Sequence, residues 1–132
     1  MHVEHVHSFS SQADADAVFA VPVDTGDGPM TLESVMVYLS AVGGSPTDVT
    51  LDVNFTDGTE TLAPIAAQSI GTAAGTVRLE PTESDKVAGN QIIPAENPKA
   101  SSPAYWRYTI DFNFTGGSSP TVTGTLVVRF RK

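Results

Sequence analysis

Three histidines, the only ones in the chain, lie within its first seven residues: His2, His5 and His7. Imidazole nitrogens bind zinc and copper, and two histidines separated by one residue project to the same face of a β-strand. His5 and His7 therefore form a suitable pair of metal ligands, whereas His2 and Glu4 would share the opposite face. A catalytic zinc site needs three protein ligands and an open position, which this segment alone does not supply. We interpret the segment as a polar edge strand that pairs with a partner chain, and we expect no bound metal.

Acidic residues gather in the predicted turns, where their oxygens are of the kind that calcium prefers. The candidate ligands are Asp14, Asp16, Asp24 and Asp27. The twelve-residue loop of helical calcium-binding hands is absent, and Asp-Gly pairs also suit turns for backbone reasons. Solvated turns are the simpler interpretation, so we expect no cofactor.

The sequence contains no recognisable catalytic machinery. There is no cysteine, which excludes thiolate nucleophiles and disulfides. A nucleophilic serine needs a base within hydrogen-bond distance, but every histidine lies at one end of the sequence. No nucleophile-elbow, phosphate-binding or dinucleotide motif occurs. Sequence spacing cannot show whether two carboxylates come together for glycoside cleavage, but the acidic residues cluster in turns rather than on a patterned strand beside aromatic residues. We predict that the protein is not an enzyme.

Large aromatic side chains alternate with polar ones between residues 104 and 114. Such aromatics can stack on sugar rings, but strict period two predicts a half-buried strand whose apolar face fills a core. Tyr105 and Arg107 lie on the opposite face and are the candidate exposed binding residues. The predicted inward residues are Trp106, Tyr108, Ile110, Phe112 and Phe114.

The same alternation predicts further strands. Residues 121–131 are expected to pair with 104–114 as a hairpin around the loop 116–120. Residues 48–55 are predicted to form a strand that is followed by a turn at Asp57-Gly58, a strong turn signal, and residues 59–65 are predicted to return beside that strand. The other predicted strands are 2–9, 17–23, 33–41 and 76–80, and residues 81–100 are expected to be irregular with a helical turn near 83–87.

Seven or eight short strands separated by Gly, Pro and Asp predict an all-β fold, an antiparallel β-sandwich of jelly-roll or Greek-key type. The 132 residues suit a single domain. We expect residues 1–12 to form an N-terminal arm or edge strand and residues 13–132 to form one sandwich.

The net charge of -8 is unevenly distributed: ten acidic residues and no Lys or Arg precede Arg78, whereas five basic residues follow from Lys99 onward. An acidic body repels phosphate backbones, so nucleic acid is not an expected partner. The basic end around Arg129 and Arg131 either docks on an acidic neighbour, including a second copy, or protects a strand edge and the terminus.

No apolar run is long enough for a membrane helix, and the first residues lack the basic and apolar regions of a secretory signal. We therefore expect synthesis in the cytoplasm and no membrane partner.

A family resemblance rests on the succession of four segments, residues 17–23, 31–38, 48–54 and 123–131. This succession resembles the small jelly-roll proteins of tailed-bacteriophage virions, namely capsid decoration (cement) proteins and head or tail fibre domains. The resemblance covers residues 13–131 through pattern, and the segment 81–100 departs from it.

This resemblance implies a non-enzymatic virion protein, a symmetric homo-oligomer such as a trimer, on the capsid surface. It would bind the major capsid protein or itself and stabilise contacts between capsomers. The alternative is a carbohydrate- or receptor-binding module of a phage tail or fibre. On the decoration hypothesis, the candidate interface residues are His2, His5, His7, Arg129 and Arg131.

Overall fold

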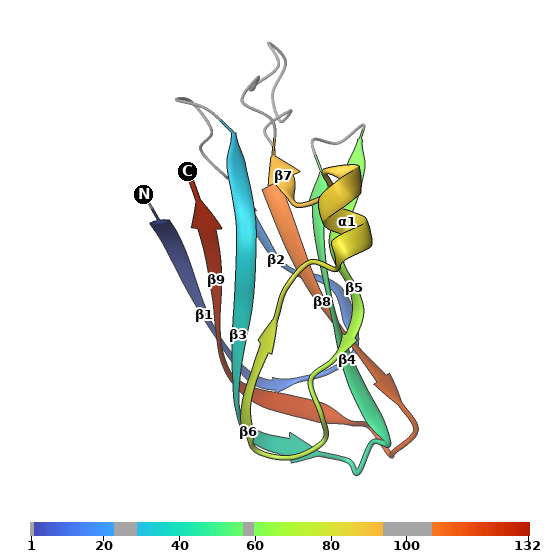
Figure 1. Cartoon of the computed structure of the whole chain (residues 1–132). Helices are drawn as coiled ribbons and strands as arrows, with labels where there is room; N and C mark the ends of the chain where they lie inside the picture. The colour runs from blue at the N-terminus through green and yellow to red at the C-terminus, as the bar shows by residue number, and fades with distance from the viewer. Residues whose placement is uncertain (1, 23–28, 57–59, 94–106) are drawn as a thin grey trace.

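The computed structural model describes residues 2–22, 29–56, 60–93 and 107–132, and of residues 15–22 the backbone alone. These residues form two layers of antiparallel strands (Figure 1). Sheet A contains β1, β9, β3 and β6 in that order, with the short β7 also paired to β3; sheet B contains β2, β8, β4 and β5. The strands are β1 (His2–Gln12), β2 (Ala15–Pro22), β3 (Met30–Gly43), β4 (Asp48–Thr56), β5 (Thr61–Ser69), β6 (Gly75–Leu79), β7 (Ile92–Ile93), β8 (Arg107–Thr115) and β9 (Thr121–Arg131).

This strand order is that of a jelly roll, a double sheet built from two Greek keys. The chain changes sheet at most of its connections, and of consecutive strands in the described residues only β4 and β5 are neighbours in one sheet. The predicted antiparallel sandwich of jelly-roll type is confirmed. The predicted return of the chain beside 48–55 is confirmed by the pairing of β4 with β5, although Asp57 and Gly58 lie outside the described residues.

The inward-facing side chains of β8 form the centre of the core. Tyr108, Ile110 and Phe112 are fully buried, Phe114 packs partly buried against them, and Trp106 lies outside the described residues. Across the sandwich, the ring centroids of Phe9 and Phe112 are 4.9 Å apart. Full burial of each such side chain contributes about 1.5–3 kcal/mol. The other fully enclosed apolar residues include Leu32, Val35, Val37, Val49, Leu51, Val53, Phe55, Ile65, Val122, Leu126, Val128 and Phe130.

The prediction that 104–114 and 121–131 form a hairpin is wrong. β8 pairs with β2 and β4 in sheet B, whereas β9 pairs with β1 and β3 in sheet A. The loop 116–120 therefore carries the chain from one sheet to the other. The alternation of apolar and polar residues shows which face of a strand is buried. The same faces are buried whether the two strands form a hairpin within one sheet or lie in opposite sheets. The pattern could not distinguish them.

Glycines allow this crossing loop to pack closely on the loop that follows β3. Gly116 and Gly117 have φ angles of 68° and 81°, in the left-handed region that favours glycine. A Cβ atom on Gly117 would lie 2.5 Å from the carbonyl oxygen of Gly44. The amide of Ser118 donates a hydrogen bond of 2.8 Å to that same oxygen. The two loops thus close one end of the sandwich together.

The segment after β6 contains the short helix α1 (Glu83–Ala88), which confirms the helical turn predicted near 83–87. The Thr82 side chain caps it by accepting a hydrogen bond from the amide of Asp85, and Gly89 ends it at a φ of 78°. α1 lies beside β5 (Figure 1). The sequence did not predict β7, because a strand of two residues has no period to detect.

Candidate functional site

The histidine-bearing strand β1 lies at an edge of sheet A and pairs with β9 on one side. His5 and His7 are half-buried on the inward face, whereas His2 is exposed on the outward face, as a regular strand requires. The outward residues are His2, Glu4, Val6 and Ser8, and the inward ones are Val3, His5, His7 and Phe9.

Both inward histidines contact the hydroxyl of Tyr108, which reaches them from β8 in the opposite sheet. The Tyr108 oxygen lies 2.9 Å from His5 Nδ1 and 2.6 Å from His7 Nε2. A tyrosine hydroxyl has one proton to donate. When both imidazoles are neutral, one therefore accepts that proton and the other donates its own N–H to the Tyr108 oxygen. These three residues, which we call the His–Tyr clamp, join the edge strand to the other sheet.

Burial keeps the His–Tyr clamp uncharged. Desolvation lowers the pKa of His5 and of His7, and the nearby His5 lowers the pKa of His7 further. Desolvation also raises the pKa of the Tyr108 hydroxyl, so it stays protonated at physiological pH. The His–Tyr clamp is therefore a neutral tyrosine hydrogen-bonded to two neutral imidazoles, and it links the two sheets. The described residues contain no group of three or more His, Cys, Asp or Glu side chains placed to hold a metal ion.

A charged cluster lies on the outward face of sheet A, centred on Glu33. Its carboxylate lies 3.5 Å from His2 Nδ1, 3.7 Å from Arg129 Nε and 3.8 Å from Arg131 Nη1. The pairing of β3 with β9 shifts register between Leu32 and Ser34, so Glu33 is the extra residue of a bulge. Glu33 therefore gathers two arginines of β9 and one histidine of β1 around one carboxylate. Arg129 and Arg131 belong to β9, which is a central strand, so they do not protect a strand edge.

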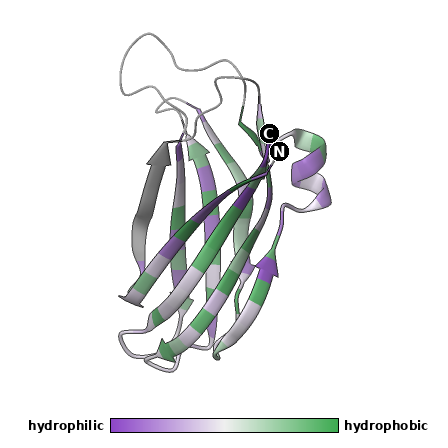
Figure 2. Cartoon of the chain, turned by 90° about the vertical axis from the view of Figure 1, so that its left-hand side faces the viewer, coloured by the Kyte–Doolittle hydropathy of each residue, from purple (hydrophilic) through white to green (hydrophobic). Residues whose placement is uncertain are grey.

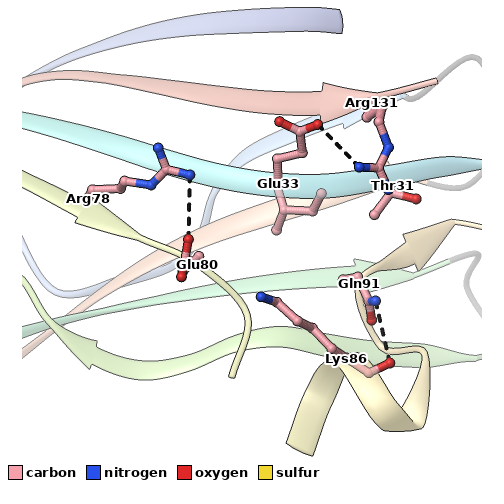
Figure 3. A pocket seen from close by; sticks show the side chains of 8 residues that line it. Thr31, Glu33, Arg78, Glu80, Lys86, Gln91 and Arg131 are labelled. Atoms are coloured by element: carbon pink, nitrogen blue, oxygen red, sulfur yellow. Dashed lines mark hydrogen bonds and ion pairs between the residues drawn. The ribbon is translucent and has the colours of Figure 1, made fainter. Parts of the chain in front are cut away.

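A shallow hollow of about 400 Å³ adjoins this cluster, between sheet A and α1 (Figure 3). Its charges are mixed in sign: Arg78 pairs with Glu80 at 3.4 Å, Arg131 pairs with Glu33, and Lys86 extends from α1. Such a hollow can bind a polar group. Its lining residues are Thr31, Leu32, Glu33, Arg78, Glu80, Lys86, Gln91 and Arg131.

The candidate exposed binding residues are only partly described. Tyr105 lies outside the described residues, and Arg107 is half-buried on β8. Of the candidate calcium ligands, Asp24 and Asp27 and the side chain of Asp16 also lie outside the described part. The interface role predicted for His2, His5, His7, Arg129 and Arg131 stays a prediction, and the structure adds that His5 and His7 face inward.

Sequence reasoning missed three features of this region. Tyr108 was assigned to the core without a partner for its hydroxyl, although two histidines on one strand face were a usable signal. Glu33 gave no signal, because the bulge that presents it depends on pairing between distant strands. Val6 has 64% of its surface exposed, but nothing in the sequence singled it out, because its neighbours in the strand are mostly polar.

Comparison with known proteins identifies no family for this chain. No protein-family model matches it, and no curated protein matches it. Among solved structures it is similar to VP2 of infectious bursal disease virus in a subviral particle, with a TM-score of 0.42 and 16% identity over 97% of this chain and 32% of that one. A chain of T=1 particles derived from infectious bursal virus gives a TM-score of 0.42 and 16% identity over 96% of this chain and 31% of that one.

The chain thus spans about a third of the length of those two viral chains. The assignment to the jelly-roll β-sandwiches rests on the strand order of this chain itself. The described residues contain one helix, of six residues, and it is too short to cross a membrane.

Proposed function

We propose that this protein is a non-enzymatic structural component of a virion, a decoration protein that binds the capsid surface of a tailed bacteriophage and stabilises contacts between capsomers. The observation that carries the proposal is the jelly roll with an interior filled by apolar side chains. Jelly rolls serve as viral capsid domains, and also as lectins and cupins. The apolar core leaves function to the outward faces and edges, which is where a capsid component would make its contacts.

The contact surface in this proposal is the region where β1 meets the charged cluster. Residues 1–12 are the contact segment, and residues 13–132 are the body of the sandwich. His2, Arg129 and Arg131 would meet an acidic partner surface, while His5 and His7 hold β1 in place through Tyr108. The partners are the major capsid protein and further copies of this chain in a symmetric homo-oligomer such as a trimer. The protein would be made in the host cytoplasm and reside on the capsid surface.

The copy number of the protein in purified virions tests this proposal. Quantitative mass spectrometry of particles from the source of the gene should find it at a level comparable to the major capsid protein. Absence from the particles would overturn the proposal. A level far below that of the capsid protein would instead place it in a tail or fibre, as the carbohydrate- or receptor-binding alternative requires, and a glycan array would then test that alternative.

A further inference from the structure

Among the described strands, three of the four sheet edges have features that hinder pairing with another chain, and β1 does not. β5 contains Pro64 and two shifts of register against β4. β2 contains a shift of register and ends at Pro22, and β6 has only five residues. Proline, bulges and short length are the usual protections of an exposed edge.

β1 is a long, regular edge by comparison. Residues 2–9 pair one for one with β9, and the first shift of register comes only after Phe9. The segment has no Pro, Gly or Lys. In a strand bonded on one side, alternate residues direct their N–H and C=O groups away from the sheet. Such a row of groups is a template for an added strand.

Among the residues that the structure describes, an apolar row crosses the outward face of sheet A and ends at Val6 on this edge. Met36 on β3 lies opposite Val127 on β9, and Val127 lies opposite Val6 on β1. Met36 and Val127 are half-buried, whereas Val6 has 64% of its surface exposed. Figure 2 shows apolar and polar residues alternating along the strands on this side of the molecule. The row would continue only if a further strand placed an apolar residue beside Val6.

We propose that β1 pairs with β1 of a second copy of this chain, antiparallel and across a two-fold axis, with Val6 opposite Val6 of the partner. An axis perpendicular to the sheet keeps the outward faces of both copies on one side. Each residue must then face one of its own parity, because a one-residue slip turns every side chain over. Only a few registers between the two β1 strands keep side chains of the same face opposite each other. These registers differ in which residues they pair.

Cross-strand chemistry chooses among these registers. Centring the axis on Glu4 would set two like charges directly opposite each other, which is destabilising. Centring it on His5 would set Glu4 opposite the exposed Val6. Centring it on Val6 sets Glu4 opposite Ser8 and joins the two apolar rows into one that crosses both sheets. A self-complementary patch of this kind is what a two-fold contact requires.

This inference rests on the proposed function in that it names a second copy as the partner of the contact segment, and it makes the homo-oligomer two-fold instead of trimeric. Its test needs only the isolated chain. Sedimentation velocity over a wide range of protein concentration should show the wild-type chain passing from monomer to dimer. A small edge contact forms a weak dimer, so the high end of the range matters. V6K should stay monomeric throughout, because it sets two ammonium groups opposite each other. The matched control is V87K on α1, where Val87 has 87% of its surface exposed, and it should dimerise like the wild type.

A mixing experiment tests the register itself. V6E alone should also be monomeric, and an equimolar mixture of V6K and V6E should dimerise, because opposite charges then face each other. Far-ultraviolet circular dichroism would confirm that both variants fold, as expected for an exposed side chain. A wild type that stays monomeric at the highest concentration, or a V6K/V6E mixture that does not dimerise, would overturn the proposal. Neither result would bear on the proposed capsid function, which is tested separately by the copy number in virions.

Discussion

Replacing Tyr108 by Phe tests the His–Tyr clamp, because it deletes one oxygen and leaves the ring that fills the core. The hydroxyl makes two contacts, 2.9 Å to His5 and 2.6 Å to His7. Each intramolecular hydrogen bond has a net value of about 1 kcal/mol, and a polar atom left buried without a partner costs about 1–3 kcal/mol. The imidazoles are only half-buried, so water can replace part of the loss.

We therefore expect Tyr108→Phe to lower the free energy of unfolding by about 1–3 kcal/mol. In a domain of this size each kcal/mol lowers the melting temperature by about 4 °C. Urea unfolding followed by circular dichroism at pH 8, where the histidines of both states are neutral, gives the difference directly. Tyr38→Phe is the matched control, because Tyr38 is 44% exposed, and it should change stability by less than about 0.5 kcal/mol. Equal stability of wild type and Tyr108→Phe would refute the hydrogen-bonding role of the hydroxyl.

The remaining predictions concern acidity, the charged cluster and the crossing loop. Because the pKa of His5 and of His7 is lower in the folded state than the ordinary value of 6.5, the unfolded chain binds more protons below that pH. Stability should therefore decline as the pH falls through 6.5, and a His5→Gln/His7→Gln variant should decline less in urea titrations between pH 8 and pH 5. Glu33→Gln should lower stability by about 1 kcal/mol at low salt and by less in 1 M NaCl, since it leaves clustered cations unpaired; an effect independent of salt would contradict this. Gly117→Ala should cost about 1–3 kcal/mol more than Gly71→Ala in thermal unfolding, because the cost of the left-handed φ angle is common to both and only the Gly117 methyl group would meet a close backbone atom; equal losses would contradict the close packing of the loops.

Most strands could be predicted from the sequence, because the alternation of apolar and polar residues is a property of each short segment by itself. The alternation from Tyr108 to Phe112 identified the core, and that of β4 did the same. Which strands become neighbours is not local, and this is where the hairpin prediction for β8 and β9 failed. A loop containing Gly116 and Gly117 can turn the chain back within a sheet or across the sandwich with the same apolar faces buried.

The candidate site was less predictable for the same reason. His5 and His7 could be placed on one face of a strand, but their partner Tyr108 lies about a hundred positions away in the other sheet. The bulge at Glu33 and the row that ends at Val6 exist only once β1, β9 and β3 are paired. Pairing between distant strands, not residue type, creates these features.

An electron cryomicroscopy reconstruction of virions from the source of the gene would test the central claim most directly. We predict a jelly roll on the outer surface of the capsid, repeated over the shell, with the face around β1 and Glu33 at the contacts between copies or with the capsid. A shell without this density would contradict the account, as would a jelly roll attached through the opposite sheet with β1 and Glu33 open to solvent.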